Sequence, residues 1–203
     1  MIKSTLKKWK HYSEISDVGA ISRRYFVMNA FDGALIMLGV VTGAYISGIA
    51  NPIPIISAGI AGSIAMGISG ISGAYMTEKA ERTRKMKSLE RAMLKDMKNG
   101  LHYKSQKFAM VFAALVDGLS PALAAMFVLS PFFVLNLGLI SSNLAFLTSI
   151  ILTLIVLFLL GVYLAKISEE SIIKYGIQML AVGLLTAFLC IITSLFLGGS
   201  IIT

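Results

Sequence analysis

Charge is what this sequence lacks. Only 14% of its 203 residues are charged, whereas a soluble domain carries about 25%. Between residues 25 and 77 the one Asp, Glu, Lys, Arg or His is Asp32, and between 108 and 165 it is Asp117. Hydrophobic residues make up 57% of the chain. This composition argues against a soluble globular domain and predicts a polytopic membrane protein.

Cysteine and histidine are also scarce. Cys190 is the one cysteine, so no disulfide forms within the chain, and the two histidines, His11 and His102, lie outside the apolar runs. A zinc site of the Cys/His type, a reactive cysteine pair and an intramembrane Ser/His pair are therefore excluded, and we expect no enzyme. No short apolar core with a cleavage site precedes Tyr25, so we expect the first span to be retained.

Five apolar runs follow one another, each near the ~20 residues that cross a bilayer as a helix. They cover about 25–48, 55–77, 108–131, 143–165 and 176–198, and the third is expected to end at Pro131. The sequence thus predicts an all-α fold with five transmembrane helices. Its parts are a basic N-terminal arm (1–24), helices one and two (25–77), a cytoplasmic helical segment (78–107) and helices three to five (108–203).

The basic residues predict the orientation. The arm, the 78–107 segment and the 166–174 loop hold 6, 10 and 2 Lys or Arg, which accounts for all 18. Because the spans alternate in direction, all 18 fall on one side, so the N-terminus is expected in the cytoplasm and the C-terminus outside. Orientation and anionic lipid explain the net charge of +8 without nucleic acid. We expect a multi-pass protein of the plasma membrane in a prokaryote, or of a vacuolar-type membrane in a eukaryote.

The two intramembrane acids are expected at similar depths. Asp32 lies eight residues past Arg24 and Asp117 ten past Lys107, which places them roughly 12 and 15 Å along their helices. Each costs at least ~2.5–3.5 kcal/mol if left uncompensated in lipid. Asn29 lies one turn before Asp32 and adds an amide oxygen on the same face.

Pro121 is a predicted helix break beside Asp117. It has no N–H, so the carbonyl of residue 117 loses its partner within the helix. Main-chain oxygens freed at membrane depth line cavities or bind ions.

Small residues mark the first two spans. Gly39 and Gly43 in span one, and Gly62 and Gly70 in span two, are predicted helix-packing positions, because small side chains let helices approach closely. Met66 is the large side chain within the stripe of span two. Its thioether is either a gap-filler or a ligand at about the depth of the acids.

Two carboxylates close together in low dielectric must share a proton or hold a cation. Alternation between the two is the physical basis of proton–cation exchange. Oxygen donors together with Met66 favour Fe²⁺ or Mn²⁺, so the predicted metal ligands are Asp32, Asn29, Met66 and Asp117. The alternatives are another cation such as Mg²⁺, or a non-transporting scaffold in which the acids are structural.

The segment after span two reads as a continuing helix over 78–98. Glu78 and Glu81, one turn apart just below the membrane, are candidates to collect cations at the mouth of a pathway. The alternative is an amphipathic helix whose apolar stripe rests on lipid or on a partner subunit. That stripe comprises Met86, Leu89, Met93 and Met97.

Two stretches resemble the vacuolar iron transporter family. Residues 29–33 (NAFDG) are similar to its Asn-Asp-Gly signature, and residues 73–81 (GAYMTEKAE) to its Gly-Glu-Tyr-x-Ser-x-Arg-Ser-Glu stretch, with Ala74 in place of the glutamate. The resemblance implies a homodimeric exporter of Fe²⁺ or Mn²⁺ driven by protons, with the metal as cargo and no permanently bound cofactor. It also implies that Asp32 is a metal ligand and that Glu81 and Glu78 collect metal on the cytoplasmic side.

Overall fold

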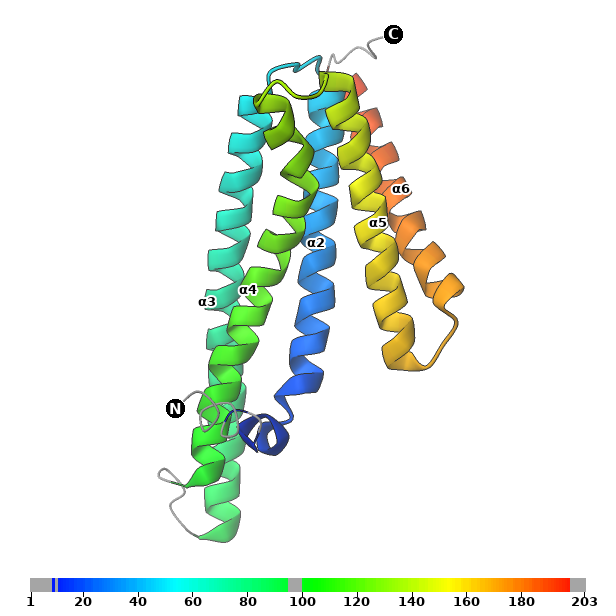
Figure 1. Cartoon of the computed structure of the whole chain (residues 1–203). Helices are drawn as coiled ribbons and strands as arrows, with labels where there is room; N and C mark the ends of the chain where they lie inside the picture. The colour runs from blue at the N-terminus through cyan, green and yellow to red at the C-terminus, as the bar shows by residue number, and fades with distance from the viewer. Residues whose placement is uncertain (1–8, 10, 95–99, 198–203) are drawn as a thin grey trace. The chain divides into compact units, whose positions relative to one another are not determined.

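The computed structural model describes residues 9, 11–94 and 100–197. They form five long helices (Figure 1): α2 (Val18–Ile46), α3 (Pro52–Met93), α4 (Leu101–Asn136), α5 (Ser142–Ser168) and α6 (Ile172–Phe196). None of the described residues lies in a strand, and all five helices are long and apolar enough to cross a membrane. The predicted all-α fold with five spans is confirmed, while the side on which each terminus lies stays a prediction.

The helices extend beyond the apolar runs. α2 already begins at Val18 and α4 at Leu101. The predicted end of the third helix at Pro131 was wrong, because α4 continues through this proline to Asn136. A proline removes only one N–H from the ladder, and side-chain hydroxyls can satisfy freed groups in membrane helices. Met97, the last member of the apolar stripe, lies outside the described residues.

Short turns join the helices after Ile46 and Asn136. Gly48 and Gly138 adopt positive φ angles of 70° and 74°, which glycine accepts without strain. At the start of α3 the side chain of Asn51 accepts the N–H of Ile53 at 3.0 Å. This bond satisfies one of the free donors at the helix N-terminus.

The chain divides into two compact units. Unit 1 comprises Met1–Phe26 and Gly67–Ser120, and unit 2 comprises Val27–Met66 and Pro121–Thr203. Helices α2, α3 and α4 therefore contribute to both units, and α5 and α6 belong to unit 2.

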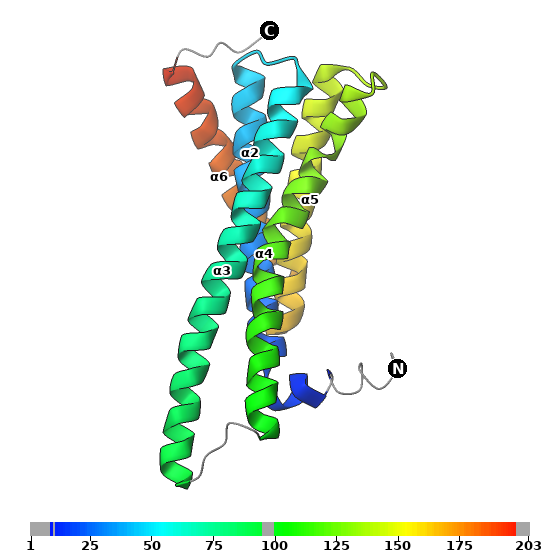
Figure 2. The same ribbon diagram turned by 90° about the vertical axis from the view of Figure 1, so that its left-hand side faces the viewer.

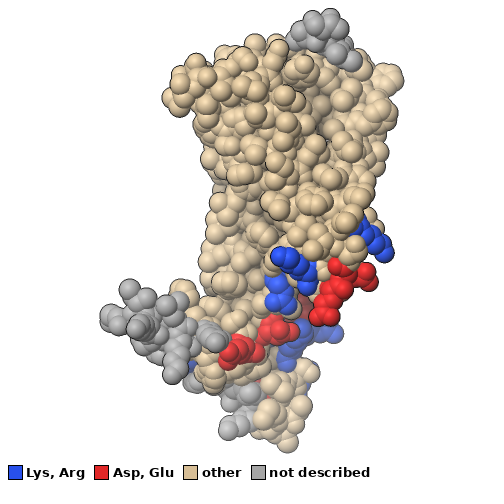
Figure 3. Space-filling view, turned by 45° about the vertical axis from the view of Figure 1, so that its right-hand side comes forward, with Lys and Arg blue, Asp and Glu red and all other residues tan. Residues whose placement is uncertain are grey.

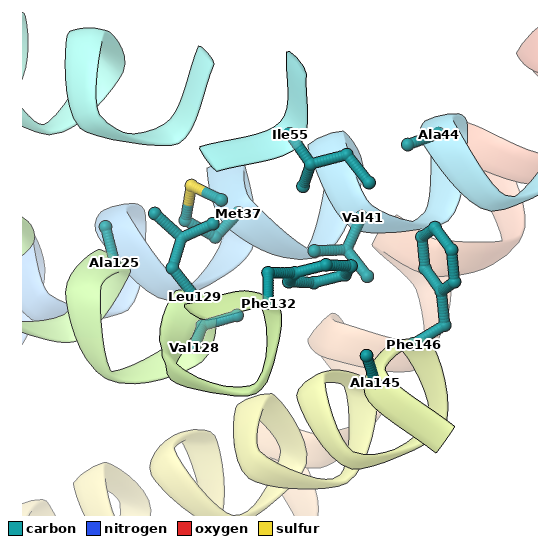
Figure 4. Packing of buried hydrophobic residues seen from close by; sticks show 10 residues of the cluster. All are labelled: Met37, Val41, Ala44, Ile55, Ala125, Val128, Leu129, Phe132, Ala145 and Phe146. Carbon is teal, nitrogen blue, oxygen red and sulfur yellow. The ribbon is translucent and has the colours of Figure 1, made fainter. Parts of the chain in front are cut away.

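An apolar cluster forms the core of unit 2 (Figure 4). Phe132 of α4 is fully buried, and its ring meets Phe146 of α5 edge-on at 5.1 Å between centroids. Tyr45 of α2 packs on the same Phe146 ring at 5.2 Å. Such aromatic pairs add to the energy of area burial. The cluster consists of Met37, Val41, Ala44, Ile55, Ala125, Val128, Leu129, Phe132, Ala145 and Phe146.

Helix α6 pairs with α5 in unit 2 (Figure 1). The contact depends on glycine, because a Cβ on Gly161 would lie 2.8 Å from the Cα of Gly176. The two backbones therefore approach closely at this point, which is how membrane helices associate when lipid supplies no hydrophobic drive.

Unit 1 has its own small core around the start of α4. Val18, Ala109 and Ala113 are buried together, and the ring of Phe108 lies 6.1 Å from that of Trp9 and 6.0 Å from that of Tyr12.

On the face shown in Figure 3 the charged side chains gather in one zone and leave a wide surface without charge. This pattern is that of a protein with a lipid-facing surface.

Candidate metal site and the glutamates of α3

Asp32 lies on α2 in unit 2, with an exposed side chain. Within the described part of the chain it makes no hydrogen bond or ion pair. Asn29, one turn earlier, is half-buried. A carboxylate in an apolar span needs compensation from a cation, a proton or another polar group, and this chain gives Asp32 none that the structure describes.

The glycine that follows Asp32 has a packing reason. A Cβ on Gly33 would lie 2.7 Å from the Cα of Pro121, and closer still to its carbonyl oxygen. Gly33 therefore lets the backbone of α2 touch the backbone of α4 within unit 2.

Asp117 lies on α4 in unit 1 and is only 8% exposed. A Cβ on Gly70 would stand 2.9 Å from its Oδ2 and 2.9 Å from the Cα of Gly118. Conversely, a Cβ on Gly118 would stand 2.9 Å from the backbone N of Ile71. α3 and α4, which run side by side here (Figures 1 and 2), thus meet through glycine, and the Asp117 carboxylate is enclosed at their contact.

Pro121 does not interrupt α4. The helix is continuous from Leu101 to Asn136 with this proline inside it, so the predicted break reduces to the loss of one N–H donor. In a regular helix the carbonyl of Asp117 accepts the N–H of residue 121, and proline has no N–H to donate.

Met66 lies in unit 2 and packs, half-buried, against the apolar cluster around Phe132. Of the predicted ligands, Asp32, Asn29 and Met66 belong to unit 2, and Asp117 belongs to unit 1. Among the described residues no three His, Cys, Asp or Glu side chains group as a metal site would require. A site shared by both acids stays a prediction.

The remaining glycines of the first two spans have different surroundings. A Cβ on Gly39 would lie 3.4 Å from the Cys190 sulfur, and a Cβ on Gly43 would lie 3.7 Å from the Ser194 hydroxyl oxygen. A Cβ on Gly62 would meet nothing within 4 Å. Gly39 and Gly43 therefore face α6, whereas Gly62 faces open space.

Glu78 and Glu81 of α3 differ sharply in their surroundings. Glu78 is 4% exposed, and its carboxylate accepts the Tyr25 hydroxyl at 3.1 Å and the Arg82 Nε at 2.7 Å. Glu81 is exposed and pairs with Lys85 at 2.7 Å. Each carboxylate already has a basic partner four residues along the helix.

Arg82 is the centre of a buried polar cluster that sequence reasoning missed. It is 5% exposed, and its Nη1 donates to the Gln106 side chain and to the Ser16 carbonyl, the latter at 3.5 Å. Gln106 Nε2 in turn lies 3.4 Å from His102 Nε2. The spacing of Glu78 and Arg82 signals an ion pair, but nothing in the sequence signals its burial by Tyr25 and Gln106.

The chain is similar to known proteins. A model of the VIT family matches residues 83–194. A protein of Methanocaldococcus jannaschii, described as uncharacterized, is 38% identical over 175 residues, which cover 85% of this chain and 88% of that protein.

Proposed function

This chain belongs to the VIT family, and we propose that it moves Fe²⁺ or Mn²⁺ out of the cytosol in exchange for protons. As a family member with five apolar helices it is a multi-pass integral membrane protein and a membrane metal-ion transporter. Members of this family are transporters rather than enzymes. The metal is cargo, and the proposal includes no permanently bound cofactor.

Asp32 is the observation that carries the proposal. It is the one charged residue of its span, its side chain is exposed, and within the described residues it has no ion pair or hydrogen bond. Such a carboxylate is stable in a bilayer only when it is protonated or faces a cation. Exchange between these two states couples metal movement to proton movement, since a metal binds only the deprotonated form.

Asp117 is the second carboxylate of the proposal. Its enclosure against Gly70 supports a role in which the carboxylate releases or binds a proton at a place shielded from lipid. Asn29 and Met66 complete the proposed ligand set, with an amide oxygen and a thioether.

A homodimer is part of the proposal. Cβ atoms on Gly62 and Gly73 would meet nothing within 4 Å, so the chain's own packing does not use these positions of α3. They leave space for a second copy to approach closely.

Metal flux into proteoliposomes under a pH gradient tests the proposal. We expect Asp32→Asn to abolish Fe²⁺ and Mn²⁺ flux and Asp32→Glu to retain part of it. Glu169→Gln, which removes an exposed acid from the α5–α6 loop, is the matched control and keeps full flux. Undiminished flux in Asp32→Asn would overturn the proposal.

The packing of Met66 favours a second candidate, a carrier for harder cations. If Met66 serves the apolar cluster alone, the remaining donors are oxygen atoms, which suit Mn²⁺ and Mg²⁺. Met66→Leu conserves volume and separates the candidates. A lower affinity for Fe²⁺ supports the thioether ligand, whereas unchanged affinity with Mg²⁺ competing effectively against Mn²⁺ supports the second candidate.

A further inference from the structure

A cavity of about 170 Å³ lies in unit 1 between the cytoplasmic part of α3 and the first turns of α4. Its walls include the apolar side chains of Met86 and Met110 and the polar side chains of Arg82, Thr83, Lys87 and Tyr103. The volume has room for several water molecules or a small polyatomic ion. The proposed metal pathway makes no use of it.

Arg82 supplies the first argument for a ligand. Nε and Nη1 of its guanidinium have partners, but Nη2 is buried and has none among the described residues. A buried donor left unpaired costs about 1–3 kcal/mol, more when charged. Such groups in native structures indicate a water or ion that completes the bonding. Arg82 is itself a wall of the cavity, so a group bound there can supply the missing acceptor.

Charge supplies the second argument. Lys87 and Thr83 line both this cavity and a second hollow on the outer face of α3, which Lys79, Arg84 and Arg91 make basic. Within the cavity the charges of Arg82 and Lys87 are balanced by Glu78, which pairs with Arg82 at 2.7 Å, and by Glu90 in the wall. The positive excess therefore comes from the neighbouring Lys79, Arg84 and Arg91, and it favours an anion over a metal cation.

We propose that this cavity binds a phosphoryl group. Arg82 and Lys87 supply the positive charge, and the hydroxyls of Thr83 and Tyr103 supply neutral donors, which is the donor set that phosphate oxygens accept. The cavity is too small for a nucleotide. The group comes either from a free phosphate or small phosphomonoester, or from a phospholipid headgroup, because the helix leaves its apolar span only a few residues earlier, at Glu78.

The proposal does not depend on which metal the protein transports, and its test uses no metal ion. The full chain is purified in a neutral detergent, and inorganic phosphate is titrated while the Tm and the heat of binding are recorded. Saturable binding that raises the Tm is expected, because a ligand of the folded state stabilises it.

Lys87→Gln is the test variant and Arg84→Gln its control. Both remove one exposed positive charge from α3, but only Lys87 lines the cavity. Loss of a charged hydrogen bond raises the Kd about ten-fold or more, so this is the result expected for Lys87→Gln, with Arg84→Gln within about two-fold of the parent. Equal weakening in both would mean non-specific attraction and would overturn the proposal.

The source of the phosphoryl group is separated by a lipid arm. Native mass spectrometry follows protein extracted from vesicles of phosphatidylcholine with or without phosphatidic acid. Retained phosphatidic acid that is lost in Lys87→Gln but not in Arg84→Gln assigns the site to a headgroup. Saturable inorganic phosphate binding without lipid retention assigns it to a soluble phosphate. If neither phosphate binding nor lipid retention is observed, Arg82 Nη2 has only water as its partner, and the proposal fails.

Discussion

Gly70 of α3 and Asp117 of α4 are in direct contact, and a Cβ on Gly70 would stand 2.9 Å from the Asp117 Oδ2. The absence of a side chain at position 70 is thus what gives the Asp117 carboxylate its place between the two helices of unit 1.

Gly70→Ala is expected to destabilise the protein. The added methyl meets the Asp117 carboxylate, which can rotate away, and also the Gly118 Cα at 2.9 Å, which cannot. Overpacking of this kind costs about 1–3 kcal/mol, so the Tm in detergent falls. Gly43→Ala is the control, since its methyl meets the Ser194 hydroxyl at an ordinary contact distance of 3.7 Å, and alanine in a helix gains up to about 1 kcal/mol over glycine. Equal effects of the two substitutions would contradict the contact.

Gly33→Ala should disturb both stability and transport. Its methyl would lie 2.7 Å from the Pro121 Cα, so α2 must move away from α4 beside Asp32. We expect a lower Tm together with lower Mn²⁺ flux per folded protein in proteoliposomes. Gly43→Ala on the same helix places its methyl at an ordinary contact distance of 3.7 Å from the Ser194 hydroxyl and should change neither. A stable Gly33→Ala protein with normal flux would show that this contact does not position Asp32.

Arg82→Gln is predicted to be among the most damaging substitutions outside the spans. It leaves the carboxylate of Glu78, whose side chain is 5% exposed, without its 2.7 Å ion-pair partner. Removal of one member of a buried pair costs about 3–5 kcal/mol, whereas removal of both is far less harmful. The double variant Glu78→Gln/Arg82→Gln should therefore unfold at a higher temperature than Arg82→Gln alone.

The neighbouring ion pair provides the matched control for that experiment. Lys85 is 72% exposed and pairs with Glu81 at 2.7 Å. Exposed pairs contribute about 0–1 kcal/mol, so Lys85→Gln should leave the Tm nearly unchanged. A Lys85→Gln protein as unstable as Arg82→Gln would refute the distinction between the two pairs.

Asp32→Asn should lose metal binding without losing the fold. The substitution removes a charge that no described residue compensates, so the metal-free Tm is expected to stay the same or rise. The rise in Tm that Mn²⁺ produces in the parent protein should disappear in the variant. In the parent this rise should also shrink as pH falls, because protons compete with the metal for the carboxylate. A Mn²⁺-dependent rise that persists in Asp32→Asn would place the metal elsewhere.

The sequence predicted the five spans because twenty apolar residues in a row have few other structures available to them. It also singled out Asp32 and Asp117, since an isolated charge is visible against an uncharged background. Its expected helix end at Pro131 failed because α4 accommodates this proline. The Ser130 hydroxyl donates at 2.7 Å to the Phe127 carbonyl, which Pro131 cannot serve, and Phe132 is held in the apolar cluster.

The surroundings of Glu78 and Arg82 needed the tertiary structure. From the sequence, Glu78 and Arg82 look like a solvated pair on a basic helix. Their burial depends on Tyr25 and Gln106, residues 53 and 24 positions from their partners in the cluster. No local pattern encodes contacts over such separations.

The sequence alone determined what the bilayer requires of this chain: the number of helices, their apolar surfaces and the two carboxylates that must be compensated. Those properties follow from the transfer of each residue from water to lipid, which is local. Only the tertiary structure decided which glycines are contacts and which face open space, that Glu78 is held by Arg82, and that one guanidinium nitrogen lacks a partner beside a cavity. These properties depend on which side chains meet across helices, and helical periodicity fixes a face of a helix but not the neighbour that covers it.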